Sequence, residues 1–231
     1  ALEDAEPPTI LLNSTIHMLY PILTNNGTRG RHAKIRDAVG DRMDIMVELH
    51  SLWDLTTAKR IAKAIEPFDP FWFEDPIKMT DMRALKDYAD ATRVPVTASE
   101  TLGMRGQFRD LLESRAAGIV MYDLSWMGGL SEARKIAAMA ETYYVTLAPH
   151  NSNGPLSTVA SLHLDMAINN CHMQELFLNS VDLYHEVLTN PIVIENGNGT
   201  PPAGPGWGTD LDDAVLAKFP PADFTPVVSE P

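Results

Sequence analysis

Acidic side chains follow three apolar runs of the sequence at a regular interval. Glu48 lies near the end of MDIMVEL, Glu74 ends FWFE and Glu100 ends TASE, so that the two intervals between successive glutamates are equal. If the runs are neighbouring parallel strands, the three carboxylates converge at one edge of the sheet and raise one another's pKa. A hard divalent cation relieves this repulsion, and Mg²⁺ or Mn²⁺ prefers carboxylate oxygen. The pattern predicts a site for Mg²⁺, with Mn²⁺ as the alternative ion.

Three further polar residues continue this series along the chain. Asp123 follows the apolar run VMY, His150 follows LAP, and Glu175 lies in MQELF. His50 stands two positions after Glu48 and therefore on the same side of the predicted strand. One charge at such a junction is as often simply solvated, whereas a succession of polar residues after apolar runs indicates a common rim. The series predicts one site that collects side chains from successive strands.

The apolar runs alternate with segments that have helical spacing of apolar residues. Strands are expected at Met43–Leu49, Phe71–Glu74, Val94–Ser99, Ile119–Tyr122 and Val145–Ala148, with a candidate sixth at Met173–Leu176. Helices are expected at Thr57–Ile65, Asp81–Ala91, Gln107–Ala117, Ser131–Thr142 and Leu156–Ala167. This alternation implies an α/β fold, either an open doubly wound sheet or a (β/α)₈ barrel. The open sheet is weakened because no Gly-rich phosphate-binding turn follows a strand.

The two ends of the chain have weaker patterns. Ile10–Leu12 and Ile16–Leu23 are candidate strands. From about Pro191 onwards, Asn196–Gly199 and Pro201–Gly206 are expected to continue neither helix nor strand, which predicts an ordered but irregular surface segment. The expected domains are an uncertain N-terminal segment (1–30), a barrel domain (31–190) and an irregular C-terminal tail that packs on the barrel (191–231).

Composition and hydropathy argue against nucleic-acid and membrane partners. The 231 residues are 45% hydrophobic and 21% charged, which is typical of a globular protein. The formal net charge of −13 argues against a nucleic-acid partner. No apolar stretch is long enough to cross a membrane, and the acidic start lacks the basic and apolar regions of a signal peptide. Cys171 is the only cysteine, which excludes an internal disulfide and leads us to expect a cytoplasmic protein.

The intervals and the flanking motifs together are specific. The interval from Glu100 to Asp123 is slightly shorter than that between the glutamates, and the interval from Asp123 to His150 is slightly longer. The motifs are IRDAVG at Ile35–Gly40, WFEDP at Trp72–Pro76, DLSWMGGL at Asp123–Leu130, the helix start Glu132–Ile136 and PPAGPGWG at Pro201–Gly208. Over roughly residues 31 to 215, the sequence resembles the barrel domain of the mandelate racemase/muconate lactonizing enzyme branch of the enolase superfamily. The resemblance implies a (β/α)₈-type TIM barrel, here partial, whose N-terminal capping domain is largely absent.

The resemblance also implies roles for the residues of the series. Glu48, Glu74 and Glu100 are expected to bind Mg²⁺, which holds the substrate carboxylate and stabilises the enediolate formed when the α-proton leaves. His150 is expected to be the acid or base on one face of the substrate. Asp123 is expected to orient the imidazole of His150 through its second ring nitrogen.

Two more positions have roles that the resemblance implies less directly. A histidine at the place of His50 can act as general acid on the departing hydroxyl in sugar-acid dehydratases of this superfamily. Glu175 is expected to be an electrophilic or hydrogen-bonding residue near the substrate carboxylate, although its interval from His150 fits the racemase pattern less well. Trp53 and Trp126 are candidates for the pocket wall.

Three departures from the family pattern affect the expected reaction. The first metal ligand of the family is usually Asp, where this chain has Glu48, which is one methylene longer. A Lys-x-Lys pair is common on the strand before this ligand, but the region Ile16–Leu23 holds His17 and Tyr20 and no lysine. The chain is also shorter than the family's two-domain architecture. Because a racemase needs a base on each face, the missing lysine favours dehydration.

The expected function is therefore Mg²⁺-dependent abstraction of the proton α to a carboxylate, with β-elimination of water from a sugar acid. A racemase, epimerase or cycloisomerase that uses the same enediolate is the alternative within the family. An inactive truncated barrel that still binds metal is the alternative outside catalysis. A hydrolase is remote because the chain has no G-x-S-x-G elbow. The protein is expected to be a homo-oligomer, as family members often are.

Overall fold

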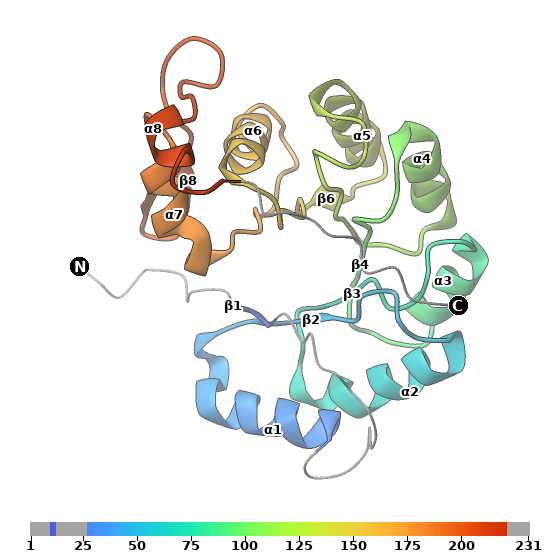
Figure 1. Ribbon diagram of the computed structural model, residues 1–231. Coiled ribbons are helices and arrows are strands. Elements are labelled where there is room, and N and C mark those ends of the chain that lie inside the picture. Colours follow the sequence, from blue (N-terminus) through green and yellow to red (C-terminus); the bar gives the residue numbers. More distant parts are fainter. Residues whose placement is uncertain (1–9, 13–26, 221–231) are drawn as a thin grey trace, which may run out of the picture.

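The computed structural model describes residues 10–12 and 27–220, which form a curved parallel sheet with helices along its outer side (Figure 1). Six strands pair side by side in chain order, and all the pairings between them are parallel. The strands are β1 (Ile10–Leu12), β2 (Ile45–Glu48), β3 (Trp72–Glu74), β4 (Val96–Ala98), β5 (Ile119–Val120) and β6 (Thr146–Leu147). This is the predicted α/β architecture of the TIM-barrel type.

The first five helices connect successive strands along the outer face of the sheet, and three more described helices follow its last strand. They are α1 (Thr28–Val39), α2 (Leu55–Ile65), α3 (Met82–Ala89), α4 (Met104–Ser114), α5 (Leu130–Thr142), α6 (Pro155–Asp165), α7 (Val181–Val187) and α8 (Asp213–Leu216). Short 3₁₀ turns lie at Gly40–Arg42, Glu66–Phe68 and Leu178–Ser180. The expected helices, which correspond to α2 through α6, are confirmed. Within the described ranges, no helix is long and apolar enough to cross a membrane.

Side chains alternate between the two faces of each strand, as the pleat requires. The outward residues join the layer between sheet and helices, for example Val47, Phe73 and Val120. The inward residues form a separate cluster in the centre of the barrel: Met46, Trp72, Ile119, Met121 and Ala148. Both faces of the sheet are therefore buried, which is why the strands appear in the sequence as continuous apolar runs.

The segment expected as a sixth strand at Met173–Leu176 does not form one. Cys171 makes an isolated parallel bridge with Leu147, and the chain lies beside β6 at that point. The pairing starts before the expected segment, and the side-chain amide of Gln174 donates to the backbone oxygens of Pro149 and Glu175. The prediction was wrong because one bridge, one backbone bond from the N–H of Glu175 to Pro149 and side-chain bonds, rather than a ladder, hold this segment.

The ends of the chain are only partly as expected. Ile10–Leu12 is a strand, whereas Ile16–Leu23 lies outside the described residues. The expectation of an irregular segment is wrong at Asn196–Gly199, because β7 (Val193–Glu195) and β8 (Asn198–Thr200) pair as a hairpin. The two connecting residues, Asn196 and Gly197, have φ of 51° and 77°. Positive φ at both positions is what the tight hairpin turn of an Asn-Gly pair requires.

Arg36 of α1 fastens the start of β2 to the loop before β3. Its guanidinium donates at 2.7 to 3.0 Å to four backbone oxygens, those of Gly40, Met43, Phe68 and Asp69. The Arg36→Lys variant keeps the charge but lacks the planar set of donors. We expect it to lower the free energy of unfolding by about 2 kcal/mol, measured by urea denaturation. Arg83→Lys, at a side chain that is 92% exposed, is the control, and an equal loss in both variants would contradict this assignment.

Asp165 at the end of α6 makes the stability of the fold depend on pH. Burial raises the pKa of this carboxyl to about 7, against a smaller opposite effect of the Cys171 thiol. In the unfolded chain the carboxyl ionises near pH 4, so between about pH 4 and 7 only the folded state holds the proton. The free energy of unfolding therefore falls as pH rises through this window, by about 4 kcal/mol in total.

The Asp165→Asn variant removes this titration. We expect the difference in free energy of unfolding between the variant and the parent to grow from about pH 4 to about pH 7 and then to stay constant. Urea denaturation at one-unit pH steps measures it. A difference that does not change with pH would show that Asp165 titrates alike in the folded and unfolded chains.

Candidate active site

The strand register brings Glu48 and Glu74 to the same level of the sheet. These residues end β2 and β3 and are direct partners in the ladder between the two strands. Because Met46 and Trp72 point into the barrel, the residues two positions later point inward as well. Glu100 lies two positions past the end of β4 on the same rim. Three consecutive strands thus each supply one carboxylate to the C-terminal end of the barrel.

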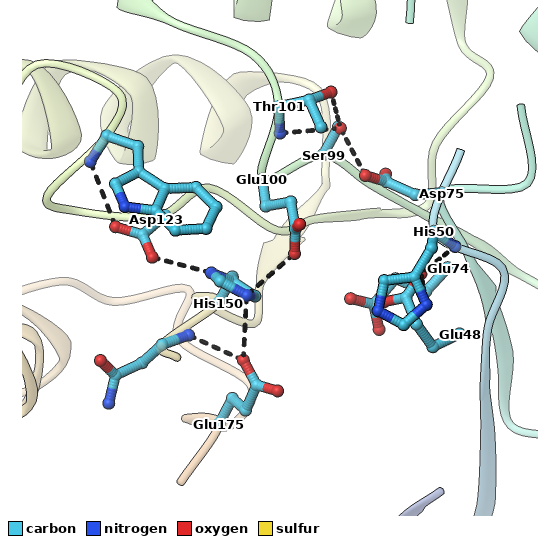
Figure 2. Close-up of polar contacts among 12 residues, drawn as sticks. Glu48, His50, Glu74, Asp75, Ser99, Glu100, Thr101, Asp123, His150 and Glu175 are labelled. Atoms are coloured by element: carbon cyan, nitrogen blue, oxygen red, sulfur yellow. Dashed lines mark hydrogen bonds and ion pairs between the residues drawn. The ribbon is translucent and has the colours of Figure 1, made fainter. Parts of the chain in front are cut away.

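The three carboxylates form a compact cluster. One oxygen each from Glu48, Glu74 and Glu100 lies within 4.8 Å of the others, and Figure 2 shows Glu48 and Glu74 beside His50. The indole N–H of Trp72 donates to Glu74 at 3.3 Å, and the backbone N–H of His50 donates to Glu48. Burial, and then the neighbouring Glu48, raise the pKa of Glu74 well above its ordinary value. Converging buried carboxylates of this kind fit a hard divalent cation, which would offset their repulsion.

Asp123 and His150 meet as the sequence predicts. The two residues form a parallel bridge beyond the ends of β5 and β6, and His150 Nδ1 lies 2.7 Å from Asp123 Oδ2 (Figure 2). A carboxylate accepts, so Nδ1 carries the proton of this bond. In the neutral ring Nε2 is then the nitrogen with a free lone pair. Asp123 is fully buried and His150 is nearly so.

Asp123 is held by donors on both of its oxygens. The backbone N–H groups of Ser125 and Trp126 donate to Oδ1 at 2.7 and 3.1 Å. The side-chain amide of Asn153 donates to Oδ2 at 2.7 Å, next to His150. This set of bonds leaves the carboxylate one orientation, in which it aligns the imidazole.

The Nε2 atom of His150 faces two further carboxylates. It lies 2.9 Å from Glu100 Oε2 and 3.8 Å from Glu175 Oε2. Burial lowers the pKa of His150, but the contacts with Asp123 and Glu100 outweigh burial and raise it to about 10. Glu175 also accepts the backbone N–H of Asn151 at 2.7 Å, while its burial raises the pKa of its carboxyl. Glu175 thus joins the site that the earlier polar residues of the series form.

His50 lies on the opposite side of the cluster from His150. Its side chain is 32% exposed, and Nδ1 is 3.8 Å from Glu48 Oε1. The backbone of His50 has φ of 53°, an uncommon conformation for a residue with a side chain. The two histidines therefore approach the three glutamates from two directions (Figure 2).

The two tryptophans singled out from the sequence differ in their surroundings. The ring of Trp126 stands 4.9 Å from the ring of His150, and 52% of the residue is exposed. Trp53 packs against the core between sheet and helices. The position of Trp126 fits a pocket wall, and that of Trp53 is explained by packing.

Sequence reasoning missed several polar residues that support the site. Asn153 holds Asp123, and its own backbone oxygen accepts the hydroxyl of Tyr184 at 2.5 Å. Asp75 and Ser99 are buried next to the glutamates and bond to each other. The only signal for Asp75 was its place in the WFEDP motif. Asn153 had none, because its partners come from α7 and from the loop after β5.

The geometry agrees with the comparison with known families. The model of the family "Enolase C-terminal domain-like" matches residues 27–215, which include every residue of the site. The chain belongs to this family. The predicted resemblance to the mandelate racemase/muconate lactonizing enzyme branch is confirmed by solved structures of that subgroup.

Two such enolase-family structures illustrate the likeness. An enolase of the mandelate racemase subgroup from Agrobacterium tumefaciens has a TM-score of 0.77 and 49% identity, over 82% of this chain and 51% of the other. A mandelate racemase/muconate lactonizing enzyme from Labrenzia alexandrii has a TM-score of 0.80 and 36% identity, over 86% of this chain and 51% of the other.

Curated relatives of this enolase-family chain include two sugar-acid dehydratases. The D-xylonate dehydratase of Haloferax volcanii is 35% identical over 188 residues, which are 80% of this chain and 45% of the relative. The D-galactonate dehydratase of Ralstonia nicotianae is 33% identical over 194 residues, which are 81% of this chain and 51% of the relative. The chain thus spans about half the length of the curated relatives it matches.

Proposed function

We propose that this protein is a Mg²⁺-dependent dehydratase that removes water from a sugar acid. The observation that carries the proposal is the joint placement of three converging glutamates and an Asp–His pair on one barrel rim. The relatives that dehydrate D-xylonate and D-galactonate support dehydration as the reaction and a sugar acid as the substrate class. Glu48, Glu74 and Glu100 would hold the cation, which stabilises negative charge on the substrate carboxylate as the α-proton leaves.

His150 receives the α-proton of the substrate at Nε2. This step needs the neutral ring, so the contact with Glu100 that raises the pKa of His150 must be released when Glu100 holds the cation. The bond from Nδ1 to Asp123 fixes the tautomer that leaves Nε2 with a free lone pair, and it stabilises the ring once Nε2 is protonated. Asn153 and the backbone donors hold the Asp123 carboxylate in place, so the ring turns little between the two protonation states. Glu175, 3.8 Å from Nε2, lies on the same side of the site and provides a polar contact to the substrate.

His50 is the donor for the departing hydroxyl. As the electron pair of the broken α C–H bond forms the double bond between the α- and β-carbons, the β C–O bond breaks and its oxygen takes a proton from His50. Water leaves, and the resulting enol becomes a 2-keto-3-deoxy acid. His150 then releases the α-proton to solvent, and the partly exposed ring of His50 regains a proton from solvent, so each turnover ends with both histidines ready for the next.

Product analysis in D₂O tests this proposal. The purified chain with Mg²⁺ is incubated with D-galactonate, D-xylonate and related sugar acids, and products are followed by proton NMR. A dehydratase yields a 2-keto-3-deoxy acid that carries solvent deuterium on the carbon next to the keto group. Exchange of the α-proton without loss of water would instead establish the racemase or epimerase reaction. Neither product nor exchange with any acid would overturn catalysis by this chain.

A further inference from the structure

The hydrogen-bonded ladder between β3 and β4 stops before Glu100, the proposed metal ligand that follows β4. Its last partners are Glu74 and Thr97, and the backbone N–H of Asp75 donates to Thr97 at 3.0 Å. The next residue, Pro76, has no N–H and cannot extend the ladder. The φ of 39° at Asp75 also turns the chain away from the sheet. Glu100 lies three positions beyond Thr97, so backbone pairing with β3 does not place its side chain.

Side-chain bonds continue the connection where the ladder ends. The hydroxyl of Ser99 donates to Asp75 Oδ2 at 2.7 Å, and both residues are almost completely buried (Figure 2). Ser99 Oγ also lies 2.7 Å from Thr101 Oγ1 and accepts the backbone N–H of Thr101 at 3.1 Å. These residues flank both glutamates, since Asp75 follows Glu74 while Ser99 and Thr101 enclose Glu100.

The hydrogens of this chain of bonds can be assigned. A serine hydroxyl has one hydrogen and two acceptor positions. Because the hydrogen of Ser99 goes to the carboxylate of Asp75, the hydroxyl of Thr101 must donate to Ser99. Ser99 Oγ is then saturated, with one bond donated and two accepted. The hydroxyl groups therefore donate in one direction, from Thr101 to Ser99 and from Ser99 to Asp75. The residues on both sides of Glu100 are held by these bonds.

We propose that Asp75, Ser99 and Thr101 form a positioning bridge that sets the separation of the Glu74 and Glu100 carboxylates. One consequence rests on the proposed function: by setting this separation, the bridge makes the site favour a small cation. Mg²⁺ requires near-ideal geometry with short bonds, whereas Ca²⁺ accepts a wider and more flexible set of oxygens. Loosening the bridge therefore penalises Mg²⁺ more than Ca²⁺.

Hydrogen exchange and cation titration of the metal-free full chain test the bridge. We expect Ser99→Ala to speed exchange of the Thr101 amide by on the order of tenfold, because that N–H loses its acceptor. The same variant is expected to weaken Mg²⁺ binding by roughly 10- to 100-fold, and Ca²⁺ binding by less. Ser161→Ala is the matched control, since Ser161 is a buried serine of α6 whose hydroxyl lacks a partner among the described residues.

Two further variants keep the test decisive if Ser99→Ala does not fold. Thr101→Val removes one hydroxyl from an exposed residue and is expected to give the same pattern with smaller amplitude. Asp75→Asn retains an acceptor oxygen for Ser99 and is expected to preserve protection of the Thr101 amide. Unchanged exchange in folded Ser99→Ala or Thr101→Val overturns the bridge, as does equal weakening of Mg²⁺ and Ca²⁺ in these two variants. A parent chain that binds neither cation refutes the proposed function instead, while the exchange result still decides the bridge.

Discussion

The Glu74→Gln variant is expected to bind Mg²⁺ at least about 100-fold more weakly than the parent chain. Replacing residues that only support metal ligands already costs about 10- to 100-fold in affinity, and Glu74 is itself in the proposed cluster. It is the most buried of the three glutamates. Its oxygen lies within 4.8 Å of those of both Glu48 and Glu100, so its loss removes one corner of the cluster. Isothermal titration measures the effect.

The same substitution has an opposite effect on stability when no cation is present. Burial and the charge of Glu48 oppose ionisation of Glu74, so a neutral amide removes part of an unfavourable interaction. We therefore expect Glu74→Gln to be more stable than the parent in chelator and less stable in saturating Mg²⁺. Glu113→Gln, at an exposed glutamate of α4, is the control for both measurements. Full Mg²⁺ affinity in Glu74→Gln would remove this glutamate from the metal site.

The His150→Asn variant is expected to lose about 10²- to 10⁴-fold in turnover of the acid sugar and to keep its affinity for Mg²⁺. The Nδ1 atom of the imidazole is held by Asp123, and its Nε2 atom faces the cluster, where we propose that it takes the α-proton. Asparagine fills part of the same space but has no basic nitrogen. The measurements are the steady-state rate of keto-acid formation and a Mg²⁺ titration of the same preparation.

Two companion variants define what the loss in His150→Asn means. Asp123→Asn is expected to cause a loss of similar order in turnover, because an amide at this position no longer fixes the tautomer. His185→Asn, at an exposed histidine of α7, is expected to leave turnover unchanged. Retention of α-proton exchange in D₂O by His150→Asn would show that another residue removes the proton.

Much of this architecture could be predicted because its determinants are local. The strands β2 to β6 are apolar on both faces and therefore appear as continuous apolar runs. The helices between them bury one side and therefore show helical spacing of apolar residues. The site residues follow from the same regularity, since Glu48 and Glu74 are ladder partners at strand ends. The spacing of the three glutamates is equal because one strand, one helix and two loops lie between each glutamate and the next.

The elements that escaped prediction depend on contacts distant in sequence. Helix α1 has few apolar residues, and its Arg36 acts through the carbonyl groups of Phe68 and Asp69, beyond the next strand and helix. The pairing of Ser99 with Asp75 requires the register of β3 and β4 to be known. The local sequence at Asn196-Gly197 was compatible with a hairpin. The same dipeptide, however, can either end a strand or connect two paired strands, so the sequence alone did not decide between them.

A crystal structure of this chain with Mg²⁺ and a bound sugar acid tests the central claim most directly. We expect one ion about 2.1 Å from an oxygen of each of Glu48, Glu74 and Glu100. We also expect the substrate α-carbon about 3 to 3.5 Å from His150 Nε2, with the β-hydroxyl facing His50. An ion bound elsewhere, or an α-carbon out of reach of His150, would contradict the assignment of this rim as a site for proton abstraction.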